Sequence, residues 1–396
     1  MIRSFFSLSL SSLLAQFLTI AFLPIITRLY SQEDFGDYQL YSSILLIFSP
    51  LISLSYPSLV GYSRHATHLV YSGVVWAVVL TSLLLLFFYL FGYIRSSIEF
   101  FIIYTHALST AIMTLFMQFI NRLKLVLLYS VLLLSFAILN NILKILFSNQ
   151  DFGYLNIVIS LAISNLIVVF ALIFVVRPQF LSILNYNLIR FFALLRKSYR
   201  FQIKLTGLQM LGLGIEWLPL AIMGVLGFKS QEIAFVGVAH LICRSLPYSF
   251  GNALYLLLLN NISQGVKIRY LLGFLLITCL IVVLLSIFNL TYGEWFFSLL
   301  FGKEWSGLAG YIYPFIPGLF SVVFFIPLSR SISVVMNKAD RIFLFDFFAF
   351  LLLLLVILIF NIFTFNVYFY IFLANLVLFL SSLLKFTYLI RYINLS

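Results

Sequence analysis

Charged residues are scarce in this sequence. Only 9% of its 396 residues are Asp, Glu, Lys or Arg, and just 11 of them are acidic, whereas soluble domains carry about 25% charged residues. This composition excludes a soluble enzyme and a disordered chain. Cysteine is scarcer still. The sequence has two cysteines, Cys243 and Cys279, and both lie in apolar segments. Two such residues indicate packing rather than a disulfide scaffold or a metal site.

Catalytic motifs are also lacking. The sequence has no Gly-x-x-x-x-Gly-Lys-Ser/Thr loop, no His-Glu-x-x-His and no Gly-x-Ser-x-Gly, which are the signatures of phosphate loops, zinc proteases and serine hydrolases. The net charge of +12 is scattered between apolar runs, unlike the clustered charge of nucleic-acid-binding proteins. We therefore expect no enzymatic activity, no cofactor, no metal and no nucleic-acid partner.

Apolar residues dominate instead, at 64% of the chain with a mean hydropathy of +1.16. A bilayer core of about 30 Å needs about 20 apolar helical residues. Such segments lie near 5–26, 38–60, 69–93, 98–120, 125–147, 154–176, 204–227, 235–259, 269–290, 311–333, 342–363 and 366–390. This pattern predicts an all-α polytopic membrane protein with about twelve transmembrane helices. We expect two six-helix bundles around a central cavity, the first over 1–182 and the second over 183–396.

The distribution of Lys and Arg predicts the orientation in the membrane. With the N-terminus inside, most of the 23 basic residues fall in inner segments, and the outer segments hold only Arg28, Arg95, Lys229 and Lys303. Cytoplasmic loops carry an excess of Lys and Arg. We therefore expect both termini to be cytoplasmic. The longest outer loop is expected near 291–310.

The longest break between spans, residues 177–203, predicts a basic amphipathic helix. It opens with Arg177-Pro178, and large apolar residues then recur at helical spacing from Leu188 to Tyr199. Such a helix lies in the inner headgroup layer.

Across this break the chain shows a weak internal repeat, because the tripeptide Ser31-Gln32-Glu33 occurs again as Ser230-Gln231-Glu232. Parallel repeats of six helices are a known plan of transporters.

Two charges lie deep within predicted spans. Glu216 is about 18 Å from the inner end of its span, and Arg244 is about 14 Å from the outer end of the next. In an antiparallel hairpin these depths coincide, so the two side chains are predicted to meet. The meeting has two interpretations: a structural ion pair, or a water-filled cavity where Arg244 attracts an anionic substrate and Glu216 takes a proton or cation.

Other polar residues within the spans carry weaker signals. Lys144, Arg330, Asp346 and Lys385 lie close to span ends, where long side chains extend to the headgroups. Arg330 and Asp346 approach the same inner surface and are placed to pair at the cytoplasmic mouth. His106 and His240 are single histidines within spans. Hydrogen-bonded packing is their expected role, with a proton relay as the alternative.

The segment from Leu23 to Tyr38, LPIITRLYSQEDFGDY, resembles the first inter-helix stretch of Wzx-type O-antigen flippases. These belong to the multidrug/oligosaccharidyl-lipid/polysaccharide exporter superfamily. In that family an apolar helix ends in Thr/Ala-Arg-Leu and a Ser-Pro-Glu-Asp-Phe/Tyr-Gly-x-Tyr turn follows; here Gln32 replaces the usual proline. The twelve spans and two-lobed division resemble the family over the whole chain, and the motif covers these sixteen residues.

The resemblance implies a flippase that moves an undecaprenyl-pyrophosphate-linked oligosaccharide across the bacterial inner membrane by ion-coupled alternating access. A cationic cavity would then bind the headgroup through Arg28, Arg244 and Arg330, and Glu216 and Asp346 would carry the coupling ion. The implied partners are membrane lipids, a polysaccharide polymerase and a chain-length regulator. Two rivals remain: a drug/cation antiporter of the same superfamily, and an integral-membrane polymerase, which usually carries a larger outer loop.

Overall fold

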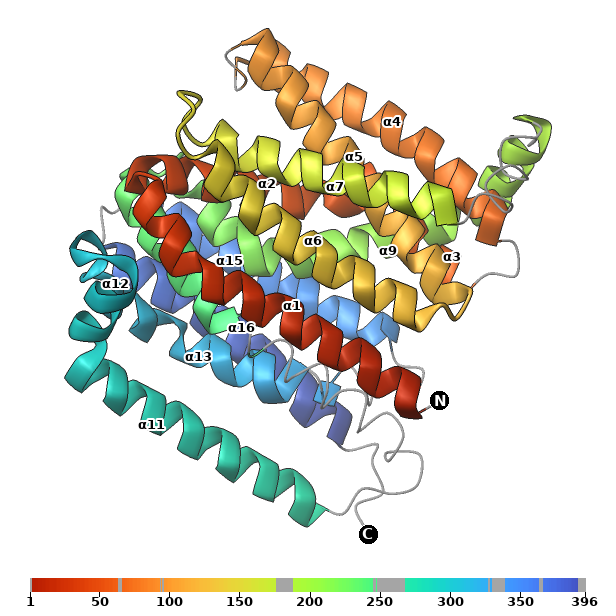
Figure 1. Ribbon diagram of the computed structural model, residues 1–396. Coiled ribbons are helices and arrows are strands. Elements are labelled where there is room, and N and C mark those ends of the chain that lie inside the picture. The colour runs from red at the N-terminus through yellow and green to blue at the C-terminus, as the bar shows by residue number, and fades with distance from the viewer. Residues whose placement is uncertain are drawn as a thin grey trace. The chain divides into compact units, whose positions relative to one another are not determined.

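The computed structural model describes residues 2–62, 66–92, 94, 96–175, 188–244, 247, 268–326, 328–329, 339–362 and 366–390, and among them every regular element is a helix. The first part of the chain forms α1 (Ile2–Leu29), α2 (Gln32–Ile52), α3 (Tyr56–Tyr62), α4 (Ala66–Leu90), α5 (Ser97–Arg122), α6 (Val126–Phe147) and α7 (Leu155–Val175). The later part forms α9 (Leu188–Ile222), a helix over 230–244, α11 (Ile268–Phe301), short helices over 303–325, α15 (Ala339–Ile362) and α16 (Val367–Ile390) (Figure 1).

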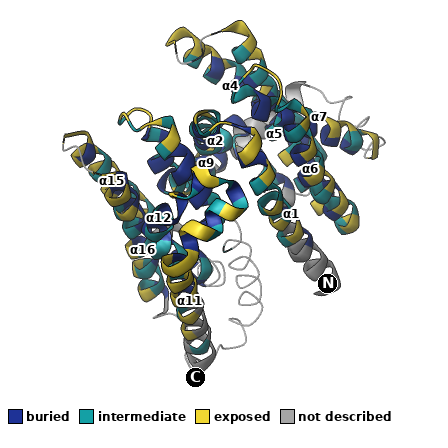
Figure 2. Cartoon of the chain, turned by 60° about the vertical axis from the view of Figure 1, so that its left-hand side comes forward, coloured by how far each residue is buried: buried dark blue, intermediate teal, exposed yellow. Residues whose placement is uncertain are grey.

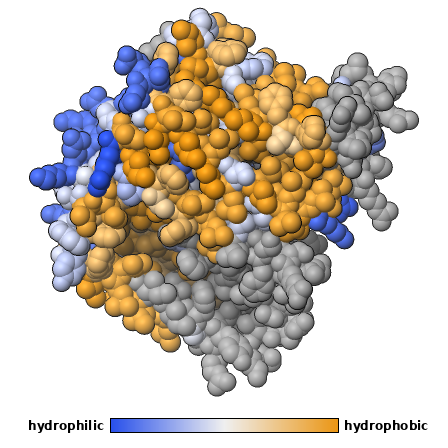
Figure 3. Space-filling view, in the orientation of Figure 1, coloured by the Kyte–Doolittle hydropathy of each residue, from blue (hydrophilic) through white to orange (hydrophobic). Residues whose placement is uncertain are grey.

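Nine helices within the described residues are long and apolar enough to cross a membrane, and each of the twelve predicted spans contains helical residues. Many large apolar side chains remain exposed, including Leu90, Phe174 and Leu290. Figure 3 shows hydrophobic residues covering most of the described part of one face, and Figure 2 shows exposed residues along α11 and α15. Large exposed apolar surfaces are unsuited to water. The chain is a multi-pass membrane protein.

Two sequence expectations about helix ends were wrong. The outer loop expected near 291–310 is helical up to Phe301, because α11 continues without a break for 34 residues. The amphipathic helix expected within 177–203 begins at Leu188 and is not separate, because it continues as α9 to Ile222. No proline interrupts this helix before Pro219, which lies close to its end.

The chain divides into two compact units. Unit 1 comprises Met1–Phe22 and Tyr41–Leu213, and unit 2 comprises Leu23–Leu40 and Gly214–Ser396. The domain boundary predicted between 182 and 183 lies outside the described residues. The chain passes from one unit to the other within α1, α2 and α9.

Unit 1 is held together by packing of small and large apolar side chains. α5 packs against α7, α4 and α3, and α6 packs against α7. One buried cluster among its described residues includes Tyr56, Leu115, Phe116 and Leu172. Because lipid is as apolar as these side chains, dense van der Waals packing rather than the hydrophobic effect stabilises the contacts between the helices.

The predicted second span is interrupted inside unit 1. α2 ends at Ile52 and α3 begins at Tyr56, and between them Leu54 and Ser55 adopt positive φ angles of 45° and 52°. Such angles are uncommon for residues other than glycine. The Ser55 hydroxyl donates to Gln209 Oε1 at 2.7 Å, so a polar contact from α9 stabilises the break.

Unit 2 contains a span built from short pieces. Residues Lys303–Phe325 meet the length and hydropathy of a span, and 56% of its most apolar window is buried. It consists of η1 (Lys303–Trp305), α12 (Leu308–Ile312), η2 (Tyr313–Phe315), α13 (Ile316–Phe320) and the π-helical η3 (Ser321–Phe325). Prolines at 314 and 317 break the regular hydrogen bonding. Irregular backbone at membrane depth is tolerated when protein surrounds it, and here α16 packs against most of these pieces.

The segment Leu23–Leu40 packs inside unit 2 through mutual capping of helix ends. Trp305 Nε1 donates to the Thr27 carbonyl at 3.2 Å, and Arg28 Nη2 donates to the Leu299 carbonyl at 2.7 Å. Both acceptors are carbonyls in the last turn of a helix, which lack an intrahelical donor. A cation at a helix C-terminus also complements the helix dipole.

The two Ser-Gln-Glu repeats both open helices. The Asp34 amide donates to Ser31 Oγ at 3.1 Å, and the Lys229 amide donates to Glu232 Oε2 at 3.1 Å. These are the two halves of a capping box. Tyr30, just before this helix start, is buried. Its burial, and to a smaller extent the nearby Asp34 carboxylate, raises the pKa of the Tyr30 hydroxyl to about 12. The motif that carries the family resemblance is therefore a helix start fixed in unit 2.

Candidate functional site

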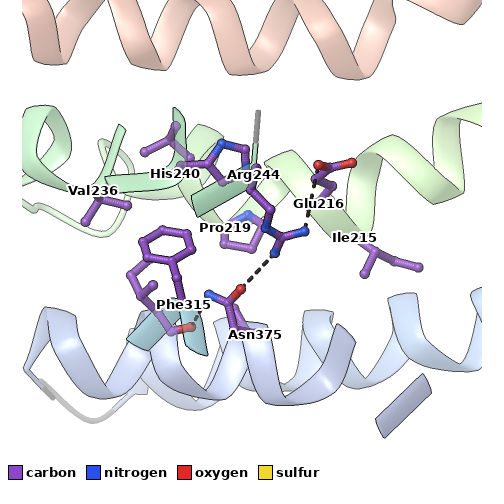
Figure 4. A pocket seen from close by; sticks show the side chains of 11 residues that line it. Ile215, Glu216, Pro219, Val236, His240, Arg244, Phe315 and Asn375 are labelled. Atoms are coloured by element: carbon purple, nitrogen blue, oxygen red, sulfur yellow. Dashed lines mark hydrogen bonds and ion pairs between the residues drawn. The ribbon is translucent and has the colours of Figure 1, made fainter. Parts of the chain in front are cut away.

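The candidate site is a small polar cavity inside unit 2. One turn of α9 contributes Glu216 and Pro219, the helix over 230–244 contributes His240 and Arg244 at a spacing of four, and α16 contributes Asn375. The cavity measures about 20 Å³, which is room for about one water molecule. Figure 4 shows Arg244 lying between Glu216 and Asn375.

Arg244 and Glu216 form the ion pair that their depths predicted. Arg244 Nη1 lies 3.7 Å from Glu216 Oε1, a separation that pairs the charges without a hydrogen bond. The Arg244 side chain is 8% exposed and that of Glu216 is 24% exposed. Arg244 is thus the more enclosed partner of the two.

Asn375 holds the guanidinium in place, and no pattern in the sequence predicts this residue. Its Oδ1 accepts a hydrogen bond from Arg244 Nη2 at 2.7 Å, and its Nδ2 donates to the Ile371 carbonyl one turn earlier at 2.9 Å. Both ends of the carboxamide are used, so its orientation is fixed. Gly318 makes this approach possible, because a Cβ there would collide with Asn375 Oδ1 and lie 3.0 Å from Arg244 Nη2.

Several buried nitrogen atoms in the cavity lack a hydrogen-bond partner among the described residues. Arg244 Nε and Nη1 and both ring nitrogens of His240 make no hydrogen bond within the described residues. The His240 ring lies between Trp217, at 4.2 Å between centroids, and Phe315, at 5.8 Å. His240 was expected to be a hydrogen-bonded packing residue; it packs, but without a hydrogen bond among those residues. Buried polar groups without partners are uncommon and indicate a water, an ion or a ligand.

Of the other predicted site residues, Arg28 and Asp346 do not line this cavity. Arg28 is exposed and caps the Leu299 carbonyl. Arg330 lies outside the described residues. Asp346 does not line the cavity and forms a hydrogen-bonded ion pair with Lys385 between α15 and α16. Lys385 was expected to extend to the headgroups; it turns inward instead, because a carboxylate on the neighbouring helix is within reach.

The chain matches no family model and no curated protein. Its fold, however, matches solved structures over nearly its whole length. A lipid II flippase, MurJ, in an inward closed conformation matches with a TM-score of 0.66 at 14% identity, covering 97% of this chain and 87% of that one.

A multidrug resistance MATE family transporter of the MOP superfamily matches in two forms. The outward-facing form has a TM-score of 0.58 at 11% identity, covering 99% of this chain and 95% of that one. The inward-facing form has a TM-score of 0.53 at 10% identity, covering 98% and 94%. The chain has the fold of these transporters. At such identities the likeness concerns the fold, and function must come from the site.

Proposed function

We propose that this protein is a flippase that moves an undecaprenyl-pyrophosphate-linked oligosaccharide, an O-antigen or other surface polysaccharide repeat unit, across the bacterial inner membrane. The observation that carries the proposal is the buried Arg244 guanidinium with uncommitted N–H groups beside Glu216. A buried charge is costly in a membrane and marks a substrate or ion pathway. The fold shared with a lipid II flippase supports the same class of substrate.

The chemistry of Arg244 suits an anionic headgroup. A guanidinium donates hydrogen bonds to diphosphate oxygens in a fixed planar geometry, and such charge-assisted bonds are stronger than neutral ones. In the described conformation the cavity holds about one water molecule, so a sugar diphosphate requires it to open. Alternating access would supply that opening, with Glu216 released from Arg244 as it takes a proton or cation while the anion replaces it.

Deletion of the gene is the direct test. We expect lipid-linked repeat units to accumulate on the cytoplasmic face, and the surface polysaccharide to disappear. Complementation with the unmodified chain should restore it, and Arg244→Ala should not, although immunoblots of isolated membranes should show the variant at normal abundance. Single unpolymerised repeats at the surface of the deletion strain would instead identify the chain as the polymerase.

A drug/cation antiporter is the second candidate, because the fold also matches MATE transporters. Such a carrier would use the Glu216 carboxylate to bind a cationic drug, and Arg244 would oppose it. Unchanged surface polysaccharide together with new drug sensitivity in the deletion strain would favour this function. The buried cation and the net charge of +12 suit an anionic substrate better.

The proposed orientation places both termini in the cytoplasm. Tyr199 is exposed near the predicted inner end of its span, and Lys303 follows α11 at the predicted outer end. We expect Tyr199→Cys to react with a membrane-impermeant thiol reagent only after the cells are opened, and Lys303→Cys to react in intact cells. The proposed partners, a polymerase and a chain-length regulator, would receive the substrate on the outer side.

A further inference from the structure

A second group of titratable side chains lies in unit 1, away from the Arg244 cavity. His106 on α5 is buried, and the Tyr41 hydroxyl from α2 lies 2.6 Å from its Nδ1. Near the start of α5, Tyr154 Oη donates to Glu99 Oε1 at 2.5 Å. Each base therefore has a tyrosine hydroxyl as its partner at a short distance for such a bond.

The two pairs lie along one side of α5. Glu99 and His106 are seven residues apart, which places them on the same helix face about 10.5 Å apart along the axis. The Tyr41 ring contacts both the His106 ring, at 5.7 Å between centroids, and the Tyr154 ring, at 6.4 Å. Glu99, Tyr154 and Tyr41 are partly exposed, whereas His106 is buried. The group thus leads from a partly solvated carboxylate to an enclosed imidazole.

One buried cation faces the imidazole from α6. Lys144 is 7% exposed and interacts electrostatically with His106; it was expected to extend to the headgroups and is enclosed instead. From α7 no ionisable residue faces the group, and Asn165 donates to Thr110 on α5 at 2.8 Å. A proton on His106 would therefore create two like charges in a low-dielectric interior, which is strongly unfavourable unless the structure opens to water.

The hydrogen bond between Tyr41 and His106 can persist through a change of protonation. With Nδ1 unprotonated, the Tyr41 hydroxyl donates to it. When Nδ1 takes up a proton, the N–H donates to the Tyr41 oxygen, so the bond reverses and neither group loses its partner. The only reactant is a proton from water, and the product is the imidazolium.

We propose that the Tyr41–His106 pair is a proton-binding site in unit 1, reached from the predicted outer face past Glu99 and Tyr154, and that it couples transport to the proton gradient. The coupling rests on the proposed transport function, whereas proton binding does not. Repulsion between protonated His106 and Lys144 favours a more open arrangement of α2, α5 and α6. Loss of the proton allows that part of unit 1 to close again.

Proton binding is tested by infrared difference spectroscopy on the full chain in lipid nanodiscs, from about pH 8 to well below the usual range of histidine titration, because burial and Lys144 disfavour the imidazolium. We expect a histidine ring band together with a shift of a tyrosine C–O band. His106→Gln, which preserves a hydrogen-bonding partner for Tyr41, should lose the tyrosine shift and the part of the histidine band that belongs to His106, while the other three histidines keep theirs. Tyr41→Phe should lose the tyrosine shift and keep the histidine band. It also serves as the second variant should His106→Gln fail to fold.

His240→Gln is the matched control, since His240 is equally buried but contacts Trp217 and Phe315 rather than a tyrosine. It should leave the tyrosine shift intact. A tyrosine shift that survives in His106→Gln, or that disappears in His240→Gln, overturns the assignment.

Coupling is tested by restoration of surface polysaccharide in the deletion strain at acidic and alkaline external pH. Cells with the unmodified chain should respond to pH, and those with His106→Gln should lose that response. A response retained in His106→Gln overturns the coupling. If the unmodified chain restores no polysaccharide at all, the proposed flippase function fails instead, while the infrared bands still decide whether the proton site exists.

Discussion

Gly318→Ala tests the architecture of the Arg244 cavity with a single methyl group. The new Cβ would collide with Asn375 Oδ1 and lie 3.2 Å from Asn375 Cγ, and the carboxamide cannot simply rotate because its Nδ2 is bonded to the Ile371 carbonyl. The Arg244–Asn375 hydrogen bond should therefore break. A hydrogen bond to a charged group contributes about 1.5–3 kcal/mol, and alanine regains about 0.5–1 kcal/mol in a helix. The net destabilisation should be about 1–2 kcal/mol.

The assay is unfolding in mixed detergent micelles, with transport measured alongside. Gly212→Ala is the matched control, because nothing lies within 4 Å of a Cβ at that position; it should leave stability unchanged or slightly raised. In an Asn375→Ala background, Gly318→Ala should lose most of its cost, since the colliding oxygen is gone and only the contact with Arg244 Nη2 at 3.0 Å remains. A neutral Gly318→Ala, or a cost that persists in that background, would refute the reasoning.

Three further outcomes are expected. Arg244→Lys should retain the variant in the membrane but lose most transport, because an ammonium lacks the planar donors that reach Asn375 and Glu216 together; normal transport would remove Arg244 from the proposed site. Glu216→Gln should alter the pH or cation dependence of transport, beyond the part assigned to His106, while retaining the fold. A dependence identical to that of the unmodified chain would assign the Glu216–Arg244 pair a structural role. Asp346→Asn should destabilise the chain by about 1.5–3 kcal/mol, whereas exchanging both residues as Asp346→Lys with Lys385→Asp should recover part of it, as unfolding midpoints would show.

Hydropathy and the depth of charged residues within the spans predicted the features that the bilayer imposes on the chain. The spans follow from the thickness of the hydrocarbon layer, and the meeting of Glu216 with Arg244 follows from equal depths in adjacent helices. Asn375 and Gly318 could not be found this way, because a neutral amide and a glycine carry no signal of depth or charge. Their place beside Arg244 depends on how α13 and α16 pack.

Contacts between helices that are distant in the chain could not be predicted from the sequence either. The pairing expected between Asp346 and Arg330 is not tested, because Arg330 lies outside the described residues. The ion pair of Asp346 with Lys385 on α16 was not predicted. Burial of Lys144 depends on neighbouring helices, since the same residue near a free helix end would extend to the headgroups. The turn at Leu54 was not predicted, because neither it nor Ser55 is a residue that favours positive φ.

Capping of α1 by Trp305 has a consequence for the order of events during synthesis. Trp305 and Thr27, whose carbonyl accepts the hydrogen bond, are separated by 278 positions in the sequence. Translation proceeds at about 5–20 residues per second. Thr27 is therefore synthesised roughly 15 to 55 seconds before Trp305, the donor to its carbonyl. Throughout that interval residues 23–40 are already made, while the later part of unit 2, against which they pack, is incomplete. Nascent chains halted before Trp305 should consequently leave residues 23–40 open to proteases and insertion factors, and chains halted well beyond it should protect them.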